Sequence, residues 1–112
     1  MRSLRPALTA ALLTAWPAAA PAQVAGDIPG DPAAGRDLAE VVCSACHRIP
    51  GMEPVLDAPG ALPFQALADD PAVTEPALRA FLLGPHPTMP NIVLSPERLN
   101  DIIAYILRLR DG

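Results

Sequence analysis

The chain has 112 residues, of which 15 are proline and 7 are glycine, and its 12 acidic residues outnumber eight basic ones. This length allows a single domain, and the proline content indicates that much of it is loop. The formal charge of −4 disfavours binding to nucleic acid or to an anionic membrane surface, because both carry dense negative charge. All eight basic residues are arginine.

Residues 1–22 have the organisation of a secretory signal peptide. A basic start is followed by an uncharged apolar run at 7–16, and Ala-Pro-Ala at 20–22 fits a small-x-small cleavage pattern. The run is short for a bilayer span, and an uncleaved N-terminal anchor is the alternative. We therefore expect a signal peptide at 1–22 and a mature domain at 23–112, with no stable membrane insertion after cleavage.

The expected mature part is strongly acidic. Residues 1–22 contain Arg2 and Arg5 but no acid, so the remainder has six arginines against 12 acids and a formal charge of −6. A protein of this charge should favour partner proteins with basic docking faces. A solvated acidic surface without any partner is the alternative interpretation.

Cys43-Ser44-Ala45-Cys46-His47 is the stretch with the clearest chemical meaning. Two cysteines three positions apart, followed at once by histidine, are typical of covalent c-type haem attachment. On one helical turn the thiols lie on the same side and can reach the two vinyl groups of one porphyrin, while the imidazole approaches the iron. The motif thus predicts one haem c, bound through two thioethers to Cys43 and Cys46 and ligated by His47.

Three other readings of the cysteine pair are weaker. A thioredoxin-like redox pair needs a βαβ context, and a structural zinc site needs four ligands. A disulfide between these cysteines would close almost no loop. Export to an oxidising compartment agrees with haem attachment, which in familiar systems occurs on the outer side of the bacterial cytoplasmic membrane. We therefore expect a periplasmic location.

The remaining pattern predicts helices and loops without strands. After a flexible lead-in at 23–30, Asp31-Pro32 begins a helix over 32–44, and a proline-rich loop at 48–63 leads to a short helical turn at 64–68. Thr74 begins a second helix that Gly84 ends, and after a second irregular stretch at 85–94 Ser95 begins a third. The third helix has five apolar residues at the spacing of one buried face: Leu99, Ile102, Ile103, Ile106 and Leu107.

Over residues 31–110 the chain resembles small bacterial monohaem cytochromes c of class I. The resemblance rests on Gly35 to His47, on Pro-Thr-Met-Pro at 87–90, and on Asp101 to Leu107. It implies an all-α fold, with three main helices and long loops wrapped around one covalently bound haem. It also implies that the first and last helices cross at Gly35 and Tyr105. The family often has an aromatic residue where this chain has Ala39, so the crossing should be tighter or less well filled.

The second axial ligand of the iron should come from a distant part of the chain. Met89, in a proline-braced loop, resembles the methionine ligand of the family and is the best candidate. Met52 is a rival by chemistry but follows His47 too closely to reach the opposite face of the ring. His86 is a nitrogen rival in the same loop as Met89, and an open site is the remaining alternative.

In the family a loop proline carbonyl accepts a hydrogen bond from the haem-ligating histidine and fixes its orientation. Here Pro63 is the expected acceptor and Pro59 the alternative. With both axial positions filled, the expected function is one-electron transfer, and the chain is expected not to be an enzyme. One alternative is a haem subunit permanently docked to a periplasmic dehydrogenase or oxidase. A haem sensor or peroxidase-like enzyme is a weaker one.

Overall fold

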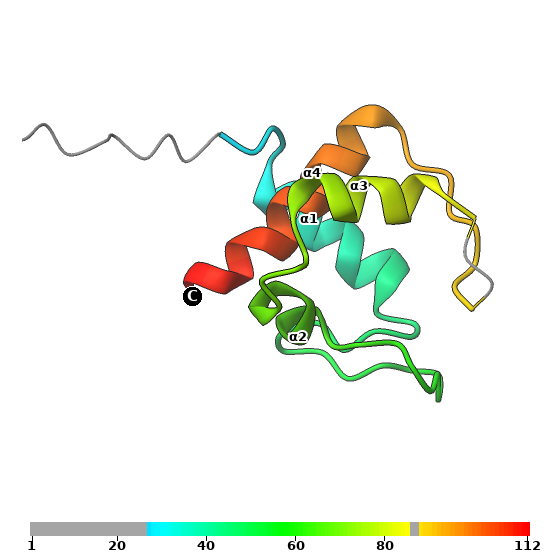
Figure 1. Ribbon diagram of the computed structural model, residues 1–112. Helices are drawn as coiled ribbons and strands as arrows, with labels where there is room; N and C mark the ends of the chain where they lie inside the picture. Colours follow the sequence, from blue (N-terminus) through cyan, green and yellow to red (C-terminus); the bar gives the residue numbers. More distant parts are fainter. Residues whose placement is uncertain (1–26, 86–87) are drawn as a thin grey trace, which may run out of the picture.

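The computed structural model describes residues 27–85 and 88–112. In these ranges the chain is helical and has no strand, as the sequence predicts (Figure 1). The α-helices are α1 (Pro32–Leu38), α2 (Phe64–Asp69), α3 (Glu75–Leu83) and α4 (Pro96–Arg108). A π-helical segment, η1 (Ala39–Cys43), continues α1, and a 3₁₀ turn, η2 (Leu109–Asp111), continues α4.

The three longest helical units begin as predicted. Asp31, Thr74 and Ser95 are the N-cap residues of α1, α3 and α4, and their side-chain oxygens accept hydrogen bonds from backbone N–H groups of the first turn. Proline occupies the first or second position of each helix, where its missing N–H has no cost. The short turn predicted at 64–68 is α2. The helix predicted over 32–44 differs in two respects, because Ala39–Cys43 adopt the wider π-helical turn and the helix ends at Cys43 with Ser44 as its C-cap.

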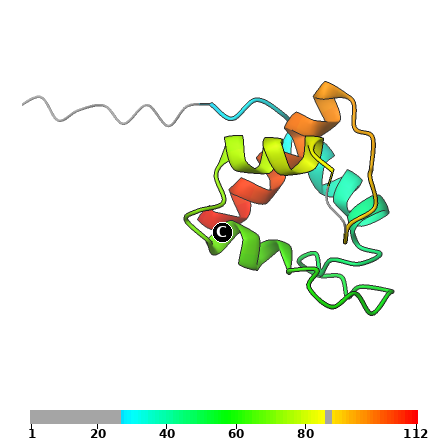
Figure 2. The ribbon, with the colours of Figure 1, turned by 45° about the vertical axis from the view of Figure 1, so that its right-hand side comes forward.

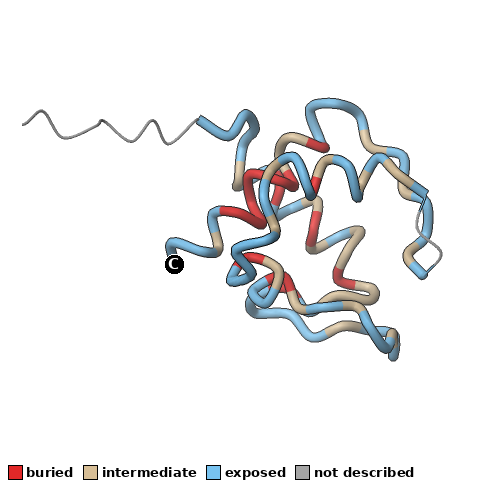
Figure 3. The backbone as a smooth tube through the Cα atoms, viewed as in Figure 1, coloured by how far each residue is buried: buried red, intermediate tan, exposed pale blue. Residues whose placement is uncertain are grey.

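α1 and α4 cross in direct backbone contact. Gly35 is buried, and a Cβ atom at this position would clash with the carbonyl of Asp101 and lie 2.8 Å from Cβ of Tyr105. Ala39, one turn later, is fully buried. The small residue at Ala39 thus accompanies a tight crossing, and Figure 3 shows the buried stretches of the two helices meeting there.

α4 is the central element of the core. Its residues 102–107 are all buried, together with Leu99, so the predicted apolar face is confirmed. Both α2 and α3 pack on α4 (Figure 2). Burial raises the pKa of Tyr105, so its phenol is neutral at physiological pH, and its ring lies 6.3 Å from the ring of Phe64 at the start of α2.

Two arginines join the outer helices to α4. Arg110, in η2, donates hydrogen bonds to the carbonyl oxygens of Ala68, Asp70 and Val73, at 2.6, 3.2 and 3.0 Å. Ala68 lies in the last turn of α2, and Asp70 and Val73 belong to the connection to α3, so one guanidinium ties the end of α2 and this connection to the end of α4. Arg79 of α3 donates to Asn100 of α4 at 2.8 Å.

The predicted signal peptide (1–22) and residues 23–26 of the predicted lead-in lie outside the described residues. Within residues 27–85 and 88–112, no helix is long and apolar enough to cross a membrane.

The crossing predicts an unusual effect of Gly35→Ala. Alanine in place of a helical glycine normally stabilises by about 1 kcal/mol. Here the methyl group would force α1 away from α4, and we expect a loss of about 1–3 kcal/mol in the free energy of unfolding of the haem-loaded protein. Chemical denaturation measures this value.

The control is Ala34→Gly on the exposed side of the same helix. This change should cost only about 0.5–1 kcal/mol, through helix propensity. A Gly35→Ala protein that is more stable than wild type would contradict a direct backbone contact between the helices.

Candidate functional site

The haem-attachment motif forms one tight turn at the end of η1. The N–H groups of Cys46 and His47 both donate to the carbonyl oxygen of Cys43, at 3.2 and 2.9 Å. Both cysteines are free thiols and partly buried. The structure therefore brings the two thiols and the imidazole onto one turn.

This turn borders a cavity of about 650 Å³. The volume lies within the range of about 300–1,000 Å³ that is usual for pockets enclosing small molecules. Its wall is formed by residues of the α-helices α1 to α4 and of both long loops. Residues that line it include Leu38, Val42, Cys43, Cys46, His47, Leu62, Phe64, Leu67, Leu78, Phe81, Leu82, Met89, Ile92, Leu94, Ile102 and Ile106.

The lining is apolar and carries no charged side chain among the described residues. Aliphatic and aromatic groups make up most of it, and neither a carboxylate nor a guanidinium borders it. Burial raises the pKa of the Cys43 thiol to about 11, so this thiol is neutral at physiological pH. The cavity suits a large apolar ring that has to be held by a few specific atoms.

His47 is fixed by a backbone carbonyl. Its Nδ1 lies 2.7 Å from the carbonyl oxygen of Leu62. Because a carbonyl oxygen only accepts, Nδ1 must carry the proton, and the lone pair of neutral imidazole is then on Nε2. The prediction of Pro63 or Pro59 as acceptor is wrong. The acceptor is Leu62, the residue just before Pro63. Pro63 itself has an extended backbone (ψ 142°) and is the N-cap residue from which α2 begins.

Phe64 supports His47 from a second direction. The two ring centroids are 5.4 Å apart and the rings are tilted by 57°. The backbone N–H of Phe64 also donates to the carbonyl of Arg48, which ties the start of α2 to the residue after His47. From the sequence, Phe64 is predicted only to belong to a short helical turn. Its apolar character next to Pro63 was visible in the sequence, but its contact with His47 depends on the path of a long loop.

The candidate methionines lie in different places. Met89 borders the same cavity as Cys43, Cys46 and His47. Met52 does not. It forms an isolated bridge with Ile49 and borders a separate shallow groove that also includes Arg48 and Glu53.

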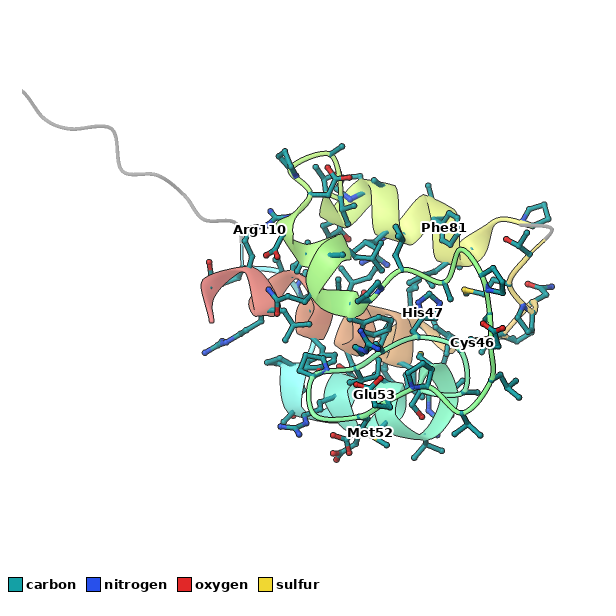
Figure 4. All side chains as sticks on the ribbon, turned by 90° about the horizontal axis from the view of Figure 1, so that it is seen from below. Cys46, His47, Met52, Glu53, Phe81 and Arg110 are labelled. Atoms are coloured by element: carbon teal, nitrogen blue, oxygen red, sulfur yellow. The ribbon has the colours of Figure 1, made fainter. Side chains whose placement is uncertain are left out.

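Figure 4 shows His47 and Cys46 near one another, whereas Met52 and Glu53 lie toward a different edge of the molecule. His86 and Pro87 lie outside the described residues. Among the described residues, no group of three or more histidine, cysteine, aspartate and glutamate side chains could hold a metal ion by itself. The thiols and the imidazole at 43–47 therefore fit a cofactor that brings its own metal.

Comparison with known proteins agrees with this site. No family model matches the chain, and no solved structure gives a significant match. Cytochrome c-552 of Bradyrhizobium diazoefficiens is 40% identical over 78 residues, which are 68% of this chain and 72% of the relative. With that similarity, an all-helical fold and a Cys-x-x-Cys-His turn on an apolar cavity, the chain belongs to the small c-type cytochromes, which carry one covalently bound haem c.

Proposed function

We propose that this cytochrome is an exported one-electron carrier of the periplasm, in which a single haem c has His47 and Met89 as axial ligands. The observation that carries the proposal is the common cavity. Two thiols, one imidazole with a free Nε2 lone pair and one thioether border it, and the thioether comes from a segment far along the chain from the other three groups.

Cys43 and Cys46 are proposed to hold the cofactor. Each thiol adds across one vinyl group, so that a carbon–sulfur bond forms and the thiol proton goes to the other vinyl carbon. The addition needs no oxidant, and a neutral thiol such as that of Cys43 has the proton to give. When bound, the haem supplies reversible one-electron chemistry at its iron.

His47 and Met89 are proposed to fill both axial positions. The Leu62 carbonyl holds His47 with Nε2 free, and it makes the imidazole a stronger donor. Methionine is a soft neutral ligand, and histidine with methionine raises the reduction potential. An iron with both positions filled does not readily bind a substrate, which favours electron transfer over catalysis at the haem.

The surface supports a protein partner for this exchange. The three apolar side chains Leu56, Leu62 and Phe81 border the cavity and are each more than half exposed. The 12 acidic residues all belong to the expected mature part, where they outnumber arginine two to one. We propose partners with a basic docking face, attracted by the overall charge and contacting the uncharged rim.

The exposed apolar rim also favours a second candidate function. A haem subunit docked permanently to a periplasmic dehydrogenase or oxidase would cover these side chains, and exposed apolar patches often mark such interfaces. The electron-transfer chemistry would be the same, and only the partner would be obligate.

The first prediction from this proposal concerns the expressed protein. In a host that attaches haem c, the periplasmic fraction should contain a red protein of the size of one free chain. Acid-acetone extraction should leave its colour with the polypeptide, because thioether bonds resist this treatment. Size-exclusion chromatography and absorbance of the two phases give the result.

Haem that enters the organic phase would rule out covalent attachment. Colour that remains with the membrane fraction or elutes with a large complex would favour the subunit alternative over a free carrier.

The second prediction concerns Met89. Sulfur ligation to ferric iron gives a weak absorption band in the near red, and Met89→Ala should abolish it and lower the reduction potential while the haem stays attached. Met52→Ala is the matched control and should keep the band, because Met52 does not border the cavity. If Met89→Ala keeps the band, the assignment of this ligand fails, and His86 is the next residue to change.

The third prediction concerns the dependence of the fold on haem. Ordering the backbone costs about 1–2 kcal/mol per residue, and a domain this small has little margin for a cavity of about 650 Å³ in its core. We expect Cys43→Ala/Cys46→Ala, prepared without haem, to be largely unfolded in water. Far-ultraviolet circular dichroism and a thermal scan measure this, with the haem-loaded wild type as the cooperative reference. Native-like helicity and a cooperative transition in the haem-free variant would show that the polypeptide alone supplies a sufficient core.

A further inference from the structure

The junction between α1 and the haem-attachment turn is a π-helical segment. α1 ends at Leu38, and residues Ala39–Cys43 form one wider turn before the turn that carries Cys46 and His47. Single π-helical turns are rare and occur frequently at functional sites, because each one costs some helix stability. The question is therefore what holds this turn and what it does.

Ser44 closes the wider turn with both of its donors. In an α-helix, the Ser44 N–H would donate to the carbonyl of Glu40, four residues earlier. Here that N–H donates to the carbonyl of Ala39, five residues earlier, at 2.9 Å. The Ser44 hydroxyl then donates to the carbonyl of Glu40 at 2.6 Å. The side chain thus replaces the hydrogen bond that the wider turn gives up.

Burial shows what the wider turn changes. Gly35 and Ala39, four residues apart, lie on the buried line of α1 that faces α4. In a continuous α-helix, the next residue on that line would be Cys43. The structure instead buries Ser44, which is only 8% exposed and is the one buried polar residue among those described.

The inserted residue has a geometric consequence for the thiols. One extra residue turns everything after it by about 100° around the helix axis. Cys43 is only partly buried and borders the cavity, together with Cys46 and His47, while Ser44 occupies the buried position. Without the wider turn, the first thiol would point toward the helix crossing.

We propose that Ser44 is a positioning residue for haem. Its hydroxyl stabilises the π-helical register that turns Cys43 and His47 toward the cavity. This inference rests on the proposed attachment of haem to Cys43 and Cys46. It adds that the residue between the cysteines is not a neutral spacer, because its hydroxyl sets the direction of the turn.

Three variants of the haem-loaded protein test the hydroxyl separately from side-chain volume, because serine is compared with alanine and threonine with valine. Ser44→Ala removes the hydroxyl, and Ser44→Thr keeps it in a side chain that can bond a preceding helical carbonyl. Ser44→Val has nearly the shape of threonine without the hydroxyl. If the loss of one hydrogen bond favours local opening of this turn about five-fold, amide hydrogen exchange at Cys43 and Ser44 should be about five times faster in Ser44→Ala.

Two further readouts report on the haem itself. In Ser44→Ala, the fraction of chains with both thioethers should fall, and the pattern of paramagnetically shifted haem methyl signals should change as the His47 ring reorients. Threonine should restore both properties, and valine should not. The amide of Ile103, in the core of α4, should exchange at the wild-type rate in Ser44→Thr.

Each outcome has a definite meaning. Wild-type exchange, attachment and methyl signals in Ser44→Ala would overturn the proposal, as would valine behaving like threonine. Equally faster exchange at Ile103 and Ser44 in the alanine variant would also overturn it, because the serine would then serve global stability alone. Absence of covalent haem in the wild type would instead contradict the proposed attachment.

Discussion

The backbone contact between α1 and α4 at Gly35 is the constraint on which the rest of the structure depends. It sets the direction of α1, and therefore the place where the attachment turn begins. α4 in turn holds the other helices, α3 through Arg79 and Asn100, and α2 through Arg110 in the turn that continues α4. The long loops are attached to these helices at both ends. The helices and loops that line the cavity are therefore all connected, directly or through α4, to the crossing.

The two sides of the site are connected to α4 in different ways. His47 receives its orientation from the Leu62 carbonyl and from the ring of Phe64, which lies between His47 and Tyr105 of α4. This is a short chain of packed groups with defined geometry. Met89, the proposed second ligand, is in an irregular segment whose ends are fixed by α3 and α4. The histidine side is thus held by local contacts, whereas the methionine side depends on how a whole loop spans two helices.

The sequence predicted the helices well because their signals are local. Only neighbouring residues are needed to recognise the apolar face of α4 and the caps at Asp31, Thr74 and Ser95, each with a proline one or two residues later. The Leu62 acceptor could not be predicted in this way, since every residue of the loop has a carbonyl and side-chain identity does not distinguish them. The π-helical turn was missed for a related reason. Alanine, glutamate and valine are all compatible with an ordinary α-helix, so their identities do not indicate a wider turn. The wider turn is recognised only from the structure, in which the buried residue after Ala39 is Ser44.

The absence of charge from the described wall of the cavity bears on the redox chemistry in addition to the ligands. Oxidation of the haem iron adds one positive charge, and an apolar wall to which the described residues contribute no carboxylate stabilises that charge poorly. The acidic groups that give the expected mature chain its negative charge do not border the cavity, and solvent and salt screen them. The lining therefore acts in the same direction as the neutral thioether proposed for Met89, and both would favour the reduced state. The acidic surface is left to act mainly on the proposed partners.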